Sequence, residues 1–562
     1  MEFSALIDIG IVIAFAALLA NVAKLLKQPL ILGYVIAGIL IGESFFGIIE
    51  NTEFIKTLSE LGIAFLLFFV GMELDFSKLK KMSRIIIITG LIQVIITFFL
   101  GALLASFWFS FIEATYIGLI VAFSSTMIVI KLLSEENVLD TLHGRIILGI
   151  LLIQDIMVVI ILPLLTTLGK FSYILILTAI LKTALLFGIA FLSKRFIFPS
   201  LIKSTAKSHE LLFITSIGIC FIFAALSYIL GFSIAIGAFL AGIALATFPY
   251  NLEIGGRIKS LKDFFSVIFF VTLGTQITFS NISKTWLPLI SLLLFILIIK
   301  PLIIFTTLKF FKHGNRTSFL SSVSLSQISE FSLILAILGL SLSHISQEIF
   351  NITLTIMIVT TTITSYIIKY HEKLFNLVSK HLIPLEKFTN KKNLENLPKE
   401  IKNHIIIFGA HRIGSKIILK LKKARRNFIV VDYNPEVIKK LISDKINCIY
   451  GDIGNIDLLE DLKIENAKLI ISTIPNTSDN LLLIELAKKK NKKITICVTT
   501  KTAEEAVSLY KNGADFVALP ELLTGLKITE FLHGKSKKEI QKAGKEFYEQ
   551  LISDKKKDKL MW

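Results

Sequence analysis

The sequence predicts a polytopic membrane domain of thirteen α-helices followed by a cytoplasmic α/β domain built on a parallel sheet. The chain has 562 residues, of which 54% are hydrophobic, and its mean hydropathy is positive. Apolar runs of spanning length fill residues 1–375, whereas residues 404–533 alternate short β-branched runs with helical patterns. A lysine-rich linker, 376–403, separates the two parts, and 534–562 is a charged tail that we expect to be a solvated helix.

The membrane domain consists of apolar segments separated by short polar breaks. The first segment carries Glu2 and Asp8 and lacks a small-residue cleavage site, so we expect it to be a span and not a signal peptide. The thirteen expected spans lie near residues 4–23, 30–48, 55–73, 85–107, 112–130, 146–166, 171–193, 210–229, 232–248, 264–282, 286–308, 318–342 and 346–368.

The loops between these spans form two alternating sets that differ in their content of Lys and Arg. One alternating set holds nearly all the Lys and Arg residues, and the other holds only Lys56, Lys170 and Lys284. Because Lys and Arg are retained on the cytoplasmic side, we expect the N-terminus outside and the C-terminus in the cytoplasm of a prokaryotic inner membrane. This orientation, with attraction to anionic membrane lipids, accounts for the net charge of +18 without nucleic acid.

Two short motifs recur in the membrane domain with the same offset. Phe68-Phe-Val-Gly-Met in the third span resembles Phe269-Phe-Val-Thr-Leu in the tenth, and Ala37-Gly-Ile-Leu in the second resembles Ala241-Gly-Ile-Ala in the ninth. An offset of seven spans puts the copies in opposite orientations. We therefore expect inverted repeats, one from the first to the sixth span and one from the eighth to the thirteenth, which is typical of transporters.

Matching spans of the two repeats contain polar breaks. Hydroxyl side chains crowd into 123–127 of the fifth span and 324–332 of the twelfth. Where such segments unwind and cross, carbonyls, hydroxyls and helix ends can replace part of a cation's water shell. For either span alone, the alternative is that the hydroxyls bond back to their own helix. The residues that we predict to contribute are Ser124, Ser125, Thr126, Gln327 and Glu330.

Gln154 and Asp155 lie in the middle of the sixth apolar span. A carboxylate there costs about 3 kcal/mol on insertion scales unless it faces a cavity or a partner. Lys300 in the eleventh span lies at a similar depth, about 14 Å from the cytoplasmic face, and is the expected ion-pair partner of Asp155. Lys182 is a rival partner, and Glu330 could pair with either lysine. The alternative to an ion site is a static pair that fixes helix packing.

Five motifs follow one another along the membrane domain: Leu32–Gly42, Leu67–Asp75, Ser124–Thr126, Gln154-Asp155 and Gly237–Gly242. Together they resemble those of the Kef-type members of the monovalent cation:proton antiporter-2 family. The resemblance implies the sodium/proton antiporter fold, a homodimer, and a core that moves like an elevator. It also implies that Asp155 binds the transported ion, K⁺ or Na⁺. A Gln-Asp pair in place of the Asp-Asp of the family's sodium exchangers suggests electroneutral potassium:proton exchange.

The function expected from this resemblance is potassium efflux in exchange for protons, with Asp155 alternating between a proton and a cation. Sodium:proton exchange is the nearest alternative. A ligand-gated potassium channel would share the general architecture, but the sequence lacks a Thr-Val-Gly-Tyr-Gly filter. The sequence has no hydride-acceptor site and no substrate domain, so we do not expect an enzyme.

Residues 404–533 are predicted to form a doubly wound parallel sheet of the Rossmann type. A helix is expected from the first strand to about Lys423. The expected strands are 404–408, 428–431, 448–450, 469–472, 494–498 and 516–518.

A glycine-rich turn, Gly409-Ala-His-Arg-Ile-Gly414, follows the first of these strands. Backbone N–H groups and the helix dipole favour a phosphate at such a turn, and Asp432 at the end of the second strand can accept from a ribose hydroxyl. The region resembles the RCK or TrkA-N regulatory domains of potassium transporters, which implies AMP or NAD(H) as ligand and pairing into dimers. The candidate residues are Gly409, His411, Arg412, Ile413, Gly414, Asp432 and Asp452.

His411 departs from the pattern, because a second glycine at this position normally lets the backbone approach a pyrophosphate. A mononucleotide, a changed loop, or a domain without a ligand are therefore alternatives to a dinucleotide.

The resemblance also implies regulation. In Kef-type systems the cytoplasmic domain inhibits transport until a small ligand such as a glutathione adduct releases it, and an ancillary subunit is a further expected partner. Coupling is expected through the acidic loop 134–143, for which a solvated loop is the alternative. Cys220, Cys448 and Cys497 are too scattered for a disulfide framework or a metal site.

Overall fold

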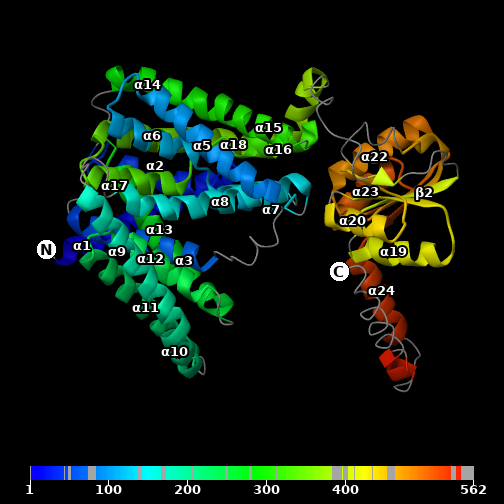
Figure 1. Cartoon of the computed structure of the whole chain (residues 1–562), viewed down its shortest axis with the longest axis horizontal. Coiled ribbons are helices and arrows are strands. Elements are labelled where there is room, and N and C mark those ends of the chain that lie inside the picture. The colour runs from blue at the N-terminus through cyan, green and yellow to red at the C-terminus, as the bar shows by residue number, and fades with distance from the viewer. Residues whose placement is uncertain are drawn as a thin grey trace. The chain divides into compact units, whose positions relative to one another are not determined.

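The computed structural model divides the chain into two compact units, residues 1–313 with 317–380 and residues 314–316 with 381–562. The first unit is helical and the second is built on a β-sheet (Figure 1). The structure describes residues 2–43, 45–48, 52–73, 84–136, 138–139, 141–165, 173–205, 208–246, 248, 251–277, 282–311, 313–382, 395–396, 403–410, 412–432, 435–451, 453, 462–532, 539–542 and 544–545. Most of the predicted linker and charged tail lies outside these residues.

The described part of the first unit consists of helices that follow one another along the chain. The first nine are α1 (Glu2–Leu25), α2 (Leu30–Ile41), α3 (Thr52–Glu73), α5 (Arg84–Ala105), α6 (Phe111–Ala122), α7 (Thr126–Glu135), α8 (Leu142–Leu165), α9 (Tyr173–Leu192) and α10 (Phe198–Thr205). The rest are α11 (His209–Ile229), α12 (Ile234–Leu245), α13 (Asn251–Thr275), α14 (Ile282–Leu294), α15 (Lys300–Phe310), α16 (Asn315–Ser324), α17 (Glu330–Ser341) and α18 (Gln347–Leu382). Short π-helical turns join α9 to α10 and α14 to α15.

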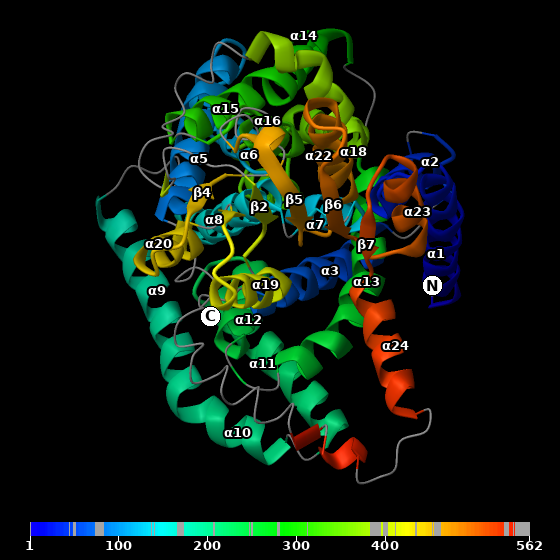
Figure 2. The same cartoon turned by 90° about the vertical axis from the view of Figure 1, so that its right-hand side faces the viewer.

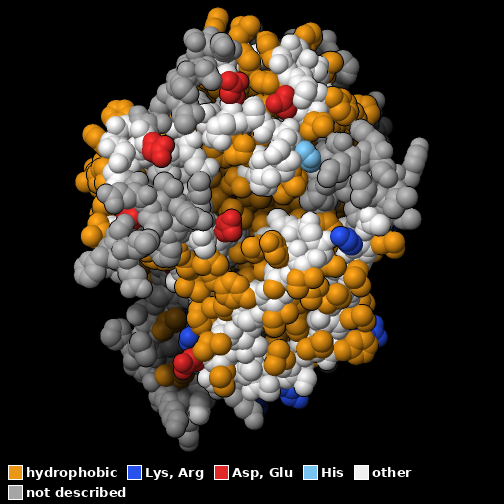
Figure 3. Space-filling view, turned by 90° about the vertical axis from the view of Figure 1, so that its left-hand side faces the viewer, with side chains coloured by type: hydrophobic (Ala, Val, Ile, Leu, Met, Phe, Trp, Pro, Cys, Tyr) orange, Lys and Arg blue, Asp and Glu red, His pale blue; other side chains and the backbone are white. Residues whose placement is uncertain are grey.

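Eight helices among the described residues are long and apolar enough to cross a membrane. Four shorter apolar helices add to them: Leu30–Ile41, Thr57–Met72, Ile234–Leu245 and Glu330–Ser341. The prediction of a polytopic helical membrane domain is confirmed, but the count of thirteen spans is not, because several apolar segments form short helices. Apolar side chains also dominate the face of this unit that Figure 3 shows.

Contacts between helices define two groups in the first unit. We call α1, α2, α3, α11, α12 and α13 the scaffold bundle, since these helices pack most extensively on one another. We call α5, α6, α7, α8, α15 and α17 the core bundle; its main contacts are α5 with α6 and α8, and α17 with α6. The candidate ion-site residues lie in the core bundle or in the polar segment just before α17.

Two glycine pairs bring scaffold helices into backbone contact. A Cβ at Gly38 of α2 would stand 2.0 Å from the carbonyl oxygen of Val271 in α13, beside Gly274. A Cβ at Gly242 of α12 would stand 2.1 Å from the carbonyl oxygen of Phe68 in α3, beside Gly71. Gly38 and Gly242 are equivalent positions of the two recurring Ala-Gly-Ile motifs, so both motifs mark a close helix crossing.

The described residues of the second unit form a seven-stranded sheet with the order β1-β4-β3-β2-β5-β6-β7. Every neighbouring pair is parallel except β1 with β4. The strands are β1 (Glu395–Asn396), β2 (His404–Phe408), β3 (Phe428–Asp432), β4 (Cys448–Tyr450), β5 (Ala467–Ser472), β6 (Thr495–Thr499) and β7 (Phe516–Ala518). From β4 to β7 this is the doubly wound dinucleotide-binding order, with its switch point between β2 and β5.

Helices cover both faces of this sheet (Figures 1 and 2). Alternate strand residues enter two separate cores: Ile407 and Val430 pack towards α19 and α20, whereas Ile406 and Ile429 pack towards α22 and α23. These helices are α19 (Arg412–Lys423), α20 (Pro435–Ser443), α22 (Thr477–Lys490) and α23 (Ala503–Lys511), followed by α24 (Pro520–Leu532). Because both faces are buried, the strands are continuous apolar runs, which is why the sequence revealed them.

All six predicted strands are present, with ends that differ by at most two residues. The prediction of a Rossmann-like domain is therefore confirmed. The short antiparallel β1 was missed, since its two residues, Glu395 and Asn396, lie in a polar segment without a strand pattern.

Candidate ion-binding site

Two helices of the membrane unit are interrupted at polar segments. The α6 helix ends at Ala122, Phe123 has an extended backbone, and α7 begins after Ser125, whose Oγ accepts a hydrogen bond from the N–H of Ile128 (3.2 Å). The α16 helix ends at Ser324, and α17 begins after Ser329, whose Oγ accepts from the N–H of Phe331 (3.2 Å). Serine therefore caps the helix that follows each break, as its short hydroxyl favours.

The two breaks lie against each other. Ser124 Oγ donates a hydrogen bond to the carbonyl oxygen of Leu325 (2.9 Å), and Ser332 Oγ donates to that of Ile120 (2.7 Å). Each bond joins residues more than two hundred positions apart, and all four residues are buried. The hydroxyls thus satisfy carbonyls of the opposite helix, so the alternative that they serve only their own helices does not hold for these two serines.

Lys300, at the start of α15, binds the carbonyl ends of both breaks. Its Nζ donates to the carbonyl oxygens of Phe123 (2.9 Å) and Gln327 (2.8 Å), and the side chain is fully buried. These contacts differ from the predicted ion pair with Asp155. The physical reason is local: carbonyls released by the two breaks need donors in a region without water, and an ammonium group supplies strong ones.

Two carboxyl groups lie beside the helix starts that follow the breaks. Thr126 Oγ1 lies 3.0 Å from both carboxyl oxygens of Asp155 on α8. The hydroxyl of the preceding residue, Ser125, donates to Glu330 Oε1 (2.7 Å). Asp155 and Glu330 are 5% and 6% exposed, so both are buried and both contact neighbouring residues of one helix start.

Gln154 supports the first break. Its Oε1 accepts from the backbone N–H of Ser124 (2.8 Å), and its Nε2 donates to Oε1 of Gln93 on α5 (2.7 Å). Gln93 Nε2 in turn donates to the carbonyl oxygen of Ala122 (3.1 Å). The two amides therefore replace helical hydrogen bonds that the break removes. Gln93 was missed by the sequence analysis, although a lone glutamine within the apolar α5 was a usable signal.

Gln327 has a different environment. The residue is fully buried, and within the described part of the chain neither Oε1 nor Nε2 of its side chain has a hydrogen-bond partner. A buried amide without partners costs stability, about 1–3 kcal/mol per group in protein mutational data. Such a group, three residues before Glu330 in the same polar segment, is a candidate ligand for a cation or its water.

Helix ends explain how these charges are distributed. The C-terminal ends of α6 and the polar segment after α16 present partial negative charge, and they meet Lys300. The N-terminal ends of α7 and α17 present partial positive charge, and they meet Asp155 and Glu330. The site between these helix ends offers carboxyl, hydroxyl and amide oxygens. Such oxygens suit a hard monovalent cation or a proton.

Among the predicted site residues, the structure pairs Thr126 with Asp155, Ser125 with Glu330 and Ser124 with Gln154 through hydrogen bonds. Lys182 is not part of this cluster. It lies exposed on α9, and its Nζ is 3.8 Å from where a Cβ at Gly231 would stand. Lys182 is therefore no rival partner for Asp155 in this structure, because it faces outward.

The glycine turn of the second unit has the steric properties that its motif predicts. Gly409 has a φ of +86°, and a Cβ at Gly414 would stand 1.9 Å from the carbonyl oxygen of Gly409. Both positions therefore require glycine. Thr473 Oγ1, at the end of β5, donates to the carbonyl oxygens of Phe408 and Gly409 (both 3.1 Å).

Asp432 lies at the end of β3 and is 6% exposed. Its Oδ2 accepts a hydrogen bond from the backbone N–H of Ala410 (2.7 Å), so the carboxylate orders the glycine turn in addition to any contact with a ribose. Ile413 is 40% exposed on the first turn of α19. The predicted residues His411 and Asp452, and the side chain of Arg412, lie outside the described part.

The fold and the two sites define a polytopic membrane protein of the transporter class with a Rossmann-like α/β domain. Residues 11–370 match the family model "Sodium/hydrogen exchanger, transmembrane", and residues 405–520 match "TrkA-N domain". The chain belongs to the sodium/hydrogen exchanger family, whose members are transporters and not enzymes. The predicted combination of an antiporter domain with a TrkA-N domain is confirmed.

Relatives with both domains match nearly the whole chain. The putative cation/proton antiporter YbaL of Escherichia coli is 28% identical over 91% of this chain and 94% of its own length. The glutathione-regulated potassium-efflux system protein KefC of the same species is 27% identical over 92% and 83%. The sodium proton antiporter MjNhaP1 of Methanocaldococcus jannaschii shares the fold of the membrane domain, with a TM-score of 0.53 at 19% identity over 66% of this chain and 98% of that structure.

Proposed function

We propose that this chain exchanges a monovalent cation, potassium in preference to sodium, for protons across the cytoplasmic membrane of a prokaryote. The observation that carries the proposal is the pair of buried carboxyl groups at the crossing of two interrupted helices, with Asp155 on Thr126 and Glu330 on Ser125. Family membership and the cation:proton relatives support the same reaction.

Asp155 is the proposed ion carrier. A cation replaces its proton, with the Thr126 hydroxyl on Asp155, the Gln327 amide and Glu330 as the proposed additional oxygen ligands. Lys300 Nζ stays hydrogen-bonded to the two carbonyl oxygens and does not follow the ion. One carboxyl that alternates between one proton and one monovalent cation gives electroneutral exchange.

The proposed architecture has thirteen membrane-crossing segments in two inverted repeats. In this proposal the helices α2, α3, α12 and α13 and the interrupted pair α16–α17 are the five spans beyond the eight long ones. The equivalent crossings at Gly38 and Gly242 support the repeat. In this scheme the core bundle carries the site past the scaffold bundle, with the N-terminus outside, the C-terminus in the cytoplasm and two copies forming a homodimer.

The second unit is the proposed regulator of transport. Gly409, Gly414 and the carboxylate of Asp432 form a turn suited to a nucleotide phosphate and ribose, and we infer AMP or NAD(H) as the ligand. Calorimetry on the His411→Gly variant checks this: binding of NADH is expected to strengthen, because the backbone can then approach the pyrophosphate. Unchanged affinity would mean that His411 does not obstruct the turn. A glutathione adduct and an ancillary subunit remain proposed further partners.

The experiment that tests the transport proposal measures internal pH in proteoliposomes after addition of potassium or sodium, with a potassium ionophore to clamp the voltage. We expect a potassium-driven, voltage-insensitive pH change that disappears in Asp155→Asn and persists in Glu210→Gln, an exposed acidic control on α11. Retained exchange in Asp155→Asn would overturn the site.

Two other outcomes distinguish the alternatives. A pH change with sodium alone would indicate a sodium:proton antiporter. Potassium flux without proton movement would indicate a channel.

A further inference from the structure

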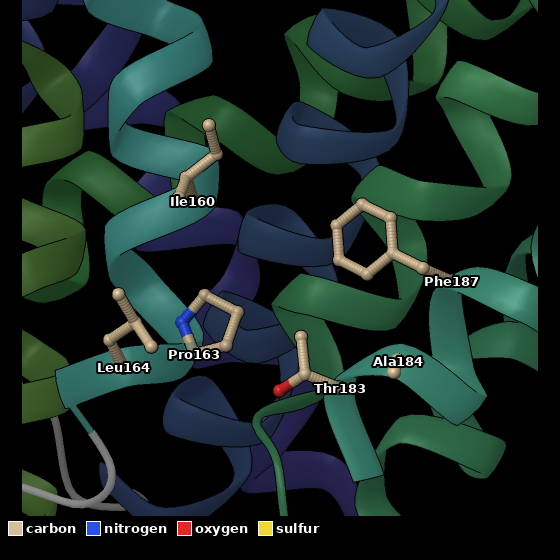
Figure 4. A pocket seen from close by; sticks show the side chains of 6 residues that line it. All are labelled: Ile160, Pro163, Leu164, Thr183, Ala184 and Phe187. Carbon is tan, nitrogen blue, oxygen red and sulfur yellow. The ribbon is translucent and has the colours of Figure 1, made fainter. Parts of the chain in front are cut away.

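An apolar groove lies between α8 and α9 of the membrane unit. It has a volume of about 340 Å³ and is lined by Ile160, Pro163 and Leu164 from α8 and by Thr183, Ala184 and Phe187 from α9. Figure 4 shows the three α8 side chains on one side and the three α9 side chains on the other. The volume is in the range of small-molecule binding sites.

The rim of the groove is exposed at the surface of the membrane unit. Both helices belong to the long membrane-crossing set, and the rim residues Ile160 and Leu164 are 57% and 50% exposed. Exposed apolar side chains of a spanning helix face hydrocarbon tails or another apolar segment. The groove is therefore filled by chains from the bilayer or by protein.

Lys182 supplies a charge beside this groove. It precedes the lining residue Thr183 on α9, its side chain is exposed, and it has no carboxylate partner among the described residues. Its Nζ lies 3.8 Å from the position of a Cβ on Gly231, in the turn that follows α11. Since α11 is itself a span that ends at Ile229, the ammonium group reaches the level of the helix ends, where headgroups lie.

We propose that the groove binds one acyl chain of an anionic phospholipid, and that Lys182 holds the phosphate of the same lipid. The apolar lining accounts for the chain and the unpaired ammonium for the headgroup charge. The ligand would lie against α8 about one and a half to two and a half turns from Asp155, at the contact between this core helix and α9. This proposal concerns lipid binding and does not depend on which ion is transported.

The test uses the full chain in nanodiscs that contain a phospholipid with a photoreactive acyl chain, as phosphatidylglycerol or as phosphatidylcholine. Cross-linked peptides are mapped by mass spectrometry. We expect residues 160–164 and 183–187 to be labelled about fivefold more by phosphatidylglycerol, the factor typical of one basic residue at a membrane surface. Lys182→Gln should remove this difference, and Lys182→Arg should keep it.

Two further variants separate groove binding from general contact with lipid. Ala184→Trp fills the groove and should abolish labelling by both lipids, whereas Leu185→Trp changes the next, non-lining residue and should not. Lys131→Gln, on the exposed side of α7, controls for loss of one positive charge. Equal labelling by the two lipids would overturn the proposal, and so would cross-links from a second protein chain in the groove.

Discussion

The two candidate sites differ in which residues form hydrogen bonds with their backbone N–H and C=O groups. At the crossed helix breaks, released N–H and C=O groups bind side chains from distant elements: Lys300 reaches Phe123 across 177 positions, and Gln154 reaches Ser124 across 30. At the glycine turn, the donors and acceptors come from strands that are direct neighbours of β2, through Asp432 and Thr473. The membrane site has no water to replace a lost partner, so single side chains there control stability.

The largest effect is expected for Lys300→Met. The change leaves the carbonyl oxygens of Phe123 and Gln327 without their donor, at about 1–3 kcal/mol for each buried group. The melting temperature of the purified full chain should fall strongly, and exchange in proteoliposomes should fall with it. Lys131→Met, which removes an exposed lysine, is the control. An unchanged melting temperature for Lys300→Met would show that the breaks do not depend on this ammonium group.

A pair of glutamine variants sharpens the comparison within the membrane site. Gln154→Leu leaves the Ser124 N–H and the Gln93 amide unsatisfied and should destabilise by about 1–3 kcal/mol for each group. Gln327→Leu removes an amide without partners and should leave stability unchanged or raised, while the cation concentration for half-maximal exchange increases. The melting temperature measures the loss of stability in each variant, and a cation titration of exchange measures the change in cation affinity. The same change in both quantities for both variants would contradict a structural role for Gln154 and a ligand role for Gln327.

For the glycine turn, we expect added side-chain volume, and not the loss of a hydrogen bond, to lower stability. Gly414→Ala places a methyl group 1.9 Å from the Gly409 carbonyl oxygen, and overpacking of this kind costs about 1–3 kcal/mol. Amide exchange of β2 and α19 should accelerate, and calorimetric binding of AMP or NADH should weaken. Gly525→Ala on α24, where no atom lies within 4 Å of the new Cβ, should change neither.

The smallest effect is a pH dependence in the second unit. Burial lowers the pKa of His404 below its ordinary value near 6.5, against the opposing hydrogen bond to the Leu462 carbonyl and the charge of Glu465. The folded state thus favours neutral imidazole, so stability is complete above about pH 6.5 and decreases as the pH falls below it. Amide exchange of β2 in the full chain should accelerate between pH 6.5 and 5, less so in His404→Gln. No pH dependence in the unsubstituted chain would contradict this.

The strands of the sheet domain were predictable almost one by one. Both faces of the sheet are buried, so each strand is a continuous apolar run in the sequence. The helix breaks were predictable for a related reason: hydroxyl-rich segments such as 123–127 and 324–332 stand out in apolar surroundings. Strand ends differed by up to two residues and the two-residue β1 was missed, since both depend on strand pairing and not on composition.

The hydrogen-bond partners in the membrane site were not predictable from the depth of the residues in the membrane. Lys300 and Asp155 lie at similar distances along their helices, which suggested an ion pair, but depth gives no azimuth around a helix. Which carbonyls a break releases, and where they point, follows only from the three-dimensional crossing. Gln93 was missed for the same reason, because its role is defined by Gln154 and Ala122 and not by a sequence motif.

The bonds of Ser124 to Leu325 and of Ser332 to Ile120 brace the two interrupted helices together. In the proposed transport scheme, a site braced in this way would move as one body and keep the same oxygen ligands on either side of the membrane. The gradients of the cation and of the proton together would then determine whether the cation leaves the cell or enters it.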